Sequence, residues 1–197
     1  MTPAPAPTTA MHTPRHPFRK TAGFTLVEVL VAVLVVSIGL LGVAKLVLAA
    51  VKANDSAYFR GQATDLAYEI LDNMRANRTY ALASPGYAVT FGAYANPGFT
   101  CLGAGNTCSP QQIAEYDLYM WKLHLNPANV GVTGLTAALP SGDGQVQMCF
   151  PSVAGCPSGQ VTATITIEWD DSVAQWAFGA APASTPNLTT FTLESAL

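Results

Sequence analysis

One apolar segment near the start of the chain limits what the protein can be. From Val29 to Val51 only Lys45 carries a charge. As an α-helix these residues would extend about 34 Å, slightly more than the roughly 30 Å hydrocarbon core of a bilayer. Lys45 lies late in the segment, where a long side chain can carry its amine to the membrane interface. The sequence therefore predicts one membrane-spanning helix.

The charges around this segment predict how it is oriented. Residues 1–23 hold Arg15, Arg19 and Lys20 and no acid, whereas the rest of the chain holds six basic and twelve acidic residues. Positive charge before the helix favours a cytoplasmic N-terminus, with the body of the protein across the membrane. The mildly acidic body argues against a nucleic acid partner, because phosphates bind to basic surfaces.

The helical pattern continues past the membrane segment. No proline occurs between Pro17 and Pro85, and the turn residues Ser84-Pro85-Gly86 then end the helix. Apolar residues recur at steps of three and four and form one stripe: Ala63, Leu66, Ala67, Ile70, Leu71 and Met74. We expect a single long helix with a membrane half, residues 24–51, and an amphipathic half, residues 52–84.

Residues 85–197 are expected to form a globular head. A second helix is predicted over Gln111–Leu125, because apolar residues line one side and Asn126-Pro127 stops it. Strands are predicted at residues 145–150, 161–169 and 188–193; the second of these alternates apolar residues with Thr and Glu. The stripe on the first helix can cover such a sheet. The predicted fold class is α+β, a long N-terminal helix packed on a small antiparallel β-sheet.

Four cysteines form two pairs of equal spacing, Cys101 with Cys108 and Cys149 with Cys156. An even number beyond a membrane segment indicates disulfides in an oxidising compartment. Several connectivities are open, and local closure, worth about 2–3 kcal/mol for each loop, is the simplest. Zinc is the weaker alternative, because the spacing is wider than in zinc fingers and only His124 lies outside the first residues.

No group of residues predicts catalysis. The sequence lacks the motifs of zinc proteases, P-loop proteins and serine hydrolases. The pair Asp170-Asp171 could contact a cation, although such pairs more often lie in solvated turns. We therefore expect no enzymatic activity, no cofactor and no bound metal.

The residues before the apolar segment carry a specific motif, Gly23-Phe24-Thr25-Leu26-Val27-Glu28. With the basic patch before it and the long helix after it, this motif resembles the leader junction of type IV pilins and type II secretion pseudopilins. The resemblance implies that a prepilin peptidase removes residues 1–23 and N-methylates Phe24. It also implies the type IV pilin fold, and it makes Glu28 the fifth residue of the mature chain.

Weaker matches, including Ser37–Gly42 and Ile70–Arg78, resemble minor pilins of the PilV type. Major pilins usually carry a proline in the membrane half, where this chain has Gly39 and Gly42. The resemblance implies a single-pass protein of the inner membrane with a periplasmic head, which later becomes part of a pilus, at its tip or along it. Its implied partners are the lipid bilayer, other minor and major pilins, and the inner-membrane pilus assembly machinery. The implied roles are adhesion, twitching motility and DNA uptake.

Glu28 places a carboxylate at the edge of an apolar segment, where an unpaired charge is costly. Cleavage would create an amine at Phe24. Opposite charges about 4 Å apart attract by about 4 kcal/mol at an effective dielectric of about 20, so pairing between neighbouring helices could set their register. Alternatively, Glu28 caps a simple membrane anchor. Two other functions stay open: a type II secretion pseudopilin, and a secreted binding domain cut after Ala49.

Overall fold

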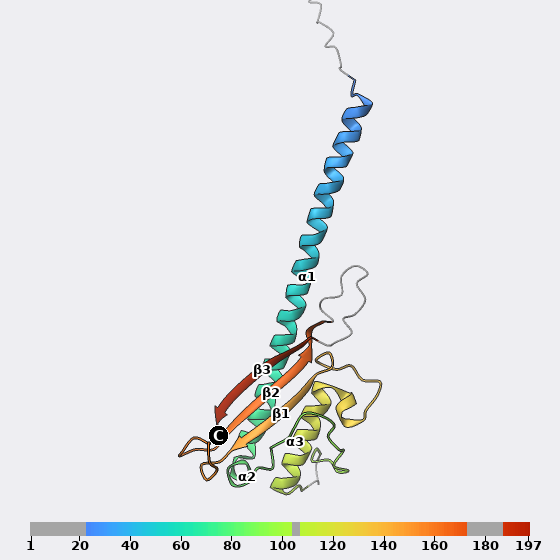
Figure 1. The fold of residues 1–197 in the computed structure, drawn as a ribbon. Helices are drawn as coiled ribbons and strands as arrows, with labels where there is room; N and C mark the ends of the chain where they lie inside the picture. The colour runs from blue at the N-terminus through green and yellow to red at the C-terminus, as the bar shows by residue number, and fades with distance from the viewer. Residues whose placement is uncertain (1–22, 104–106, 173–186) are drawn as a thin grey trace, which may run out of the picture. The chain divides into compact units, whose positions relative to one another are not determined.

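The computed structural model describes residues 23–103, 107–172 and 187–197. The expected leader, residues 1–23, therefore lies outside the described residues except for Gly23. The chain divides into two units, residues 1–44 and residues 45–197. The longest element, helix α1, runs from Leu26 to Ala76 and has residues in both units (Figure 1).

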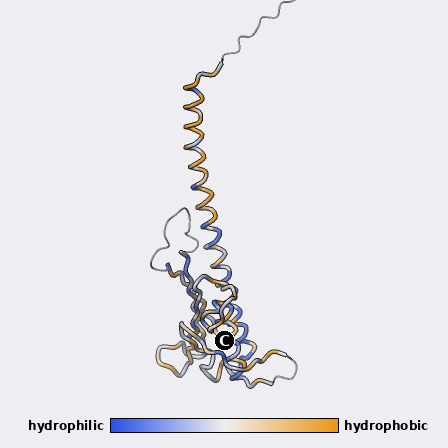
Figure 2. Tube along the Cα trace, turned by 90° about the vertical axis from the view of Figure 1, so that its right-hand side faces the viewer, coloured by the Kyte–Doolittle hydropathy of each residue, from blue (hydrophilic) through white to orange (hydrophobic). Residues whose placement is uncertain are grey.

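In the first unit, the surface of α1 is apolar and uncovered. The large apolar side chains between Phe24 and Val43 are 52% to 86% exposed. Figure 2 shows this part of the helix almost wholly in the hydrophobic colour. Among the described residues, α1 is the one helix long and apolar enough to cross a membrane, judged by length and composition.

In the second unit, α1 becomes part of a packed core. All six residues of the predicted stripe, from Ala63 to Met74, are buried. The spacing of three and four residues puts them on one side of the helix, where the sheet and a second helix cover them. The predicted packing of the long helix on a small sheet is confirmed.

The long helix ends earlier than expected. It stops at Ala76, and the separate helix α2 follows over Arg78–Ala83, so the prediction of one unbroken helix to residue 84 is wrong at Asn77. The side-chain amide of Asn77 donates hydrogen bonds to the carbonyl oxygen of Pro110, at 2.7 Å, and to the hydroxyl of Tyr87, at 3.2 Å. These bonds, to partners outside the helix, stabilise the break.

Helix α3, Pro110–Leu125, forms where the sequence predicts a helix. It begins with a capping box: the Ser109 hydroxyl accepts from the Gln112 amide, and the Gln112 side chain accepts from the Ser109 amide. Asn126 caps its end, and the short 3-10 helix η1, Pro127–Val130, follows. These local hydrogen bonds satisfy backbone groups that a helix end leaves unpaired.

Three antiparallel strands form the sheet, in the order β1 (Asp143–Cys149), β2 (Thr162–Asp170) and β3 (Leu188–Ala196). In the register, Val146 stands opposite Ile165, which stands opposite Leu193. These apolar residues face α1, and the intervening residues face outward. The three strands lie at the predicted places, each with somewhat different ends.

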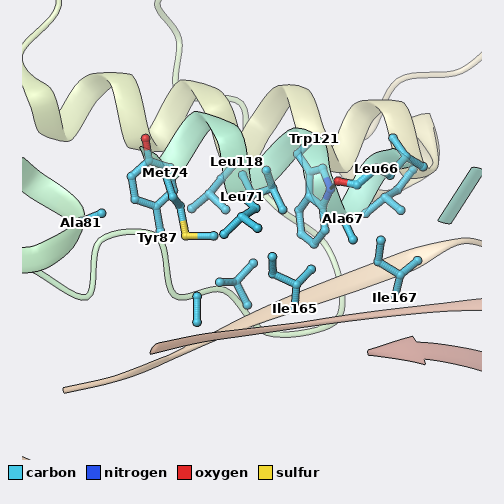
Figure 3. Packing of buried hydrophobic residues seen from close by; sticks show 14 of the residues in the cluster. Leu66, Ala67, Leu71, Met74, Ala81, Tyr87, Leu118, Trp121, Ile165 and Ile167 are labelled. Atoms are coloured by element: carbon cyan, nitrogen blue, oxygen red, sulfur yellow. Dashed lines mark hydrogen bonds between the residues drawn. The ribbon is translucent and has the colours of Figure 1, made fainter. Parts of the chain in front are cut away.

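The core lies between α1, α3 and the sheet. Figure 3 shows the Trp121 ring of α3 beside Leu66 and Ala67 of α1, above Ile165 and Ile167 of β2. Trp121 is fully buried, and its indole N–H donates to the carbonyl oxygen of Leu66 at 2.9 Å. A buried indole needs such a partner, because an unpaired polar group in the core is destabilising.

One lysine lies inside this core region. Lys122 is fully buried, and its ammonium bonds the Asp143 carboxylate at 2.5 Å and the carbonyl oxygens of Thr90, at 3.0 Å, and Gly92, at 3.2 Å. The carboxylate also accepts hydrogen bonds from Gly92, Asn129 and Gly144. This cluster fastens the loop after α2 to α3 and to the start of β1.

Two disulfides close short loops, Cys101 to Cys108 and Cys149 to Cys156. This is the local pairing that is simplest from the sequence, and no cysteine is left to hold zinc. The second bond joins the end of β1 to the connection that leads into β2. Both bonds restrict loops that carry few core residues.

The acidic pair at the end of β2 is occupied by hydrogen bonds. Asp170 accepts from the backbone amides of Ser172, at 2.9 Å, and Asn187, at 3.2 Å. The hydrogen bond from the Ser172 side chain, together with these two backbone bonds, holds the pKa of Asp170 below its usual range. Asp171 accepts from the hydroxyl of Ser56 on α1, at 2.9 and 3.0 Å. Within the described residues, no three metal-ligating side chains lie together.

Candidate functional site at the start of the apolar helix

The predicted cleavage point precedes the first turn of α1. Gly23 and Phe24 lie outside the helix, and Phe24 is 83% exposed. A Cβ atom added at Gly23 would meet no atom within 4 Å. No described residue therefore blocks an enzyme from reaching the peptide bond between Gly23 and Phe24.

Thr25 caps the start of α1. The backbone amide of Glu28 donates to the Thr25 hydroxyl at 3.3 Å and to the Thr25 carbonyl oxygen at 3.1 Å, and the amide of Val29 donates to the same carbonyl at 3.3 Å. Threonine followed three residues later by glutamate is the sequence signature of a helix start. This signal could have been found in the sequence, and it explains the threonine of the junction. The cap survives cleavage after Gly23.

Glu28 lies in the first turn of α1 and is exposed. Its carboxylate has no hydrogen bond or ion pair with any described residue, so its charge is available to a cation from elsewhere. The unpaired amides of a helix start favour a negative charge here. The helix thus fixes the position of Glu28, while no described residue pairs with its carboxylate.

Gly39 and Gly42 lie in the exposed part of α1, and the helix continues through both positions. A Cβ atom at either position would meet nothing within 4 Å, so packing inside the described chain does not require glycine there. Nearby, the Ser37 hydroxyl donates back to the carbonyl oxygen of Val33 at 2.7 Å. Small residues on a membrane helix allow a neighbouring helix to approach closely.

A buried tyrosine and a partly buried aspartate in the head have shifted pKa values. The Tyr87 hydroxyl donates to the Asp117 carboxylate at 2.7 Å. Burial raises the pKa of Tyr87 well above its usual range, and this hydrogen bond acts in the same direction. Burial also raises the pKa of Asp117, against the lowering effect of the bond, and the charge of Glu69 adds to the rise. Both groups join α3 to the loop after α2 and have a structural role.

His124 is half-exposed, and its ring bonds Glu69 of α1 at 2.8 Å. Its ring has no hydrogen bond to Asp170 or Asp171. The structure therefore does not join His124 and this acidic pair in one site. The described residues of the head provide packing and hydrogen bonding, whereas the residues predicted to take part in processing and assembly lie at the start of α1.

Comparison with known protein families agrees with this division. The model of the prokaryotic N-terminal methylation motif matches residues 18–44. A second model, described as type IV pilin Tt1218, matches residues 45–119. No curated protein and no solved structure matches the chain.

The two matches adjoin at residue 45 and together extend from the basic patch through most of α3. The junction motif, the exposed apolar helix and the helix-on-sheet head define a membrane-anchored filament subunit made as a precursor. The chain belongs to the type IV pilin family. Such proteins are structural subunits, processed by prepilin peptidase and assembled with other pilins.

Proposed function

We propose that this chain is a minor pilin of the PilV type, which joins other pilins to initiate, cap or modify a type IV pilus. The proposal rests on the junction at Gly23 and Phe24, followed by an apolar helix that the described residues leave uncovered. A subunit with no enzymatic role fits this architecture. Adhesion, twitching motility and DNA uptake are the activities that such a pilus would support.

The proposed assembly step pairs the carboxylate of Glu28 with an amine that processing creates. Removal of residues 1–23 turns Phe24 into an N-terminal amine next to the apolar surface. The unoccupied carboxylate of Glu28 can pair with this amine, in the same chain or in a neighbour. Lipid is as apolar as leucine, so apolar faces fix the register of neighbouring helices poorly, and a charge pair adds the missing specificity. The head would remain in the periplasm until the helix enters the filament.

Two alternatives make different predictions about processing. A type II secretion pseudopilin would share the leader, the helix and the sheet, and would differ in the machine it serves. A secreted domain would be cut after Ala49. That bond lies inside α1, which is continuous from Leu26 to Ala76, whereas the bond after Gly23 lies before the helix. The location of the two bonds favours the pilin proposal.

The mature N-terminus is the decisive observation. Mass spectrometry of the chain from membranes should find N-methylated Phe24 as the first residue. Gly23→Val should leave the leader attached, whereas Ala49→Val, the matched control, should be processed normally. A mature chain beginning at Ala50 would overturn the proposal.

Incorporation into filaments tests the role of the charge. Glu28→Val should be processed normally but should be strongly reduced in pili sheared from cells, and Ser37→Ala should be incorporated as in wild type. Normal incorporation of Glu28→Val would contradict charge pairing. In cells with both systems, a secretion defect without a pilus defect on deletion would favour the pseudopilin.

A further inference from the structure

A pocket with mixed polar and apolar walls lies on the head beside β1. It has a volume of about 560 Å³. Its side-chain lining includes Thr90, Ala93 and Tyr94 from the loop after α2, and Gln145 and Gln147 from β1. Both glutamines alternate with the buried Val146, so they point to the outer face of the sheet. We call this the Gln–Tyr pocket.

The pocket cannot easily accept another β-strand, because the edge of β1 is closed at this point. Val146 and Val89 exchange two backbone hydrogen bonds, of 2.8 and 3.0 Å. An added strand would have to displace this bridge. Recognition at the pocket therefore depends on side chains rather than on free backbone groups.

The polar lining has unused hydrogen-bonding capacity. Among the described residues, neither glutamine side chain nor the Tyr94 hydroxyl has a hydrogen-bond partner. A glutamine amide both donates and accepts, which matches a hydroxyl group that also does both. The Tyr94 ring, half-buried beside these amides, offers an apolar face on which a ring of C–H groups can lie.

The surface beside the pocket continues the same chemistry. Across the sheet, Gln145 stands opposite Thr166 and then Thr192, and Gln147 stands opposite Thr164 and then Glu194. All of these side chains share the outer face, and the ones on β3 are exposed. A chain-like ligand could thus extend from the pocket over rows of amides and hydroxyls, with one carboxylate at Glu194, spaced by the strands.

The pocket lining carries no formal charge. Lys122, whose ammonium donates to the carbonyl oxygen of the pocket residue Thr90, is fully buried and bonded to Asp143, so it cannot neutralise a phosphate or sulfate. The pocket therefore lacks the basic groups that binding of nucleic acids or acidic polymers requires. The two amides and the Tyr94 ring, set among apolar walls that include Val89 and Met148, instead suit an uncharged ligand with hydroxyl groups and C–H faces.

From this geometry we propose that the Gln–Tyr pocket binds an uncharged polysaccharide, with the two glutamines bonding sugar hydroxyls and Tyr94 stacking on a sugar ring. The Val89–Val146 bridge and the Lys122 cluster hold the pocket walls in place before binding. The site lies on the head and does not depend on whether the chain enters a pilus, so it can be tested separately from the proposed function.

Binding should be measured on the full chain in lipid nanodiscs, free of glycoside detergents. The probes are maltohexaose, cellohexaose and dextran, with dextran sulfate as a charged counterpart. We expect at least one uncharged probe to bind at millimolar concentration or below, and dextran sulfate to bind more weakly than dextran. Removing one amide should weaken binding by about twofold to tenfold, as expected for one hydrogen bond.

The variants separate the pocket from the rest of the surface. Gln145→Ala, Gln147→Ala and Tyr94→Leu should each weaken binding, whereas Gln160→Ala, on the exposed connection before β2, should not. Thermal unfolding of each variant shows whether the fold is intact. The proposal is overturned if no uncharged probe binds, if dextran sulfate binds best, or if Gln160→Ala loses as much affinity as the pocket variants.

Discussion

Replacing Lys122 with methionine tests how strongly one buried charge pair supports the head. The ammonium has three oxygen partners, on β1 and on the loop after α2, and no exposure to solvent. Methionine fills a similar volume but donates no hydrogen bond. The variant therefore leaves the Asp143 carboxylate without its cation and two carbonyl groups without a donor.

The structure sets the size of the effect. Removing one partner of a buried ion pair typically costs about 3–5 kcal/mol. Asp143 keeps three hydrogen bonds from amide groups and is 14% exposed, so part of its charge remains solvated. We therefore expect a loss near the lower limit, about 3 kcal/mol in the free energy of unfolding of the head.

The assay is urea unfolding of the full chain in nanodiscs, followed by the fluorescence of the buried tryptophans. Lys52→Met, on α1 and without a partner in the described residues, is the matched control and should change stability by less than about 0.5 kcal/mol. Lys122→Met/Asp143→Asn should recover part of the loss, because no buried charge then remains unpaired. A loss below about 1 kcal/mol for Lys122→Met would refute the reasoning.

Three further changes test other parts of the head. Because the pKa of Asp117 is raised in the fold, the head should lose stability as the pH rises through that pKa. Asp117→Asn should lessen this loss when unfolding is measured from about pH 4 to 7. A variant with the same pH profile as wild type would contradict this expectation. Gly144→Ala would push a Cβ atom into the ring of Trp121, so we expect the free energy of unfolding in urea to fall by about 1–3 kcal/mol. An unchanged free energy of unfolding would contradict this and would mean that the ring moves aside. Cys149→Ser/Cys156→Ser should lower the free energy of unfolding by about 2–3 kcal/mol, and an equal melting temperature for the variant and wild type would contradict a stabilising bond.

Strong periodic patterns let the sequence predict most of the fold. The stripe from Ala63 to Met74 is buried as expected, because a spacing of three and four residues places side chains on one side of a helix. The alternation in β2 likewise identifies its inner face. In both cases the signal is local and repeated over many residues.

Single residues with distant partners were harder to predict. Lys122 follows Leu118 and Trp121 on the buried side of α3, a position that could have indicated a buried charge, but its acidic partner is twenty-one residues away. The break at Asn77 depends on Pro110 and Tyr87. The Gln–Tyr pocket depends on the bridge between Val89 and Val146, and no short-range pattern encodes such a pairing.

The exposed surface of α1 also determines how a subunit can travel. Fourteen large apolar side chains between Phe24 and Val43 are uncovered. At about 1.5 kcal/mol or more each, leaving them in water would cost on the order of 20 kcal/mol. A free aqueous subunit would therefore be too rare to serve as an intermediate. Any move of this helix between a bilayer and a helical bundle must proceed sideways, with one apolar neighbour replacing another.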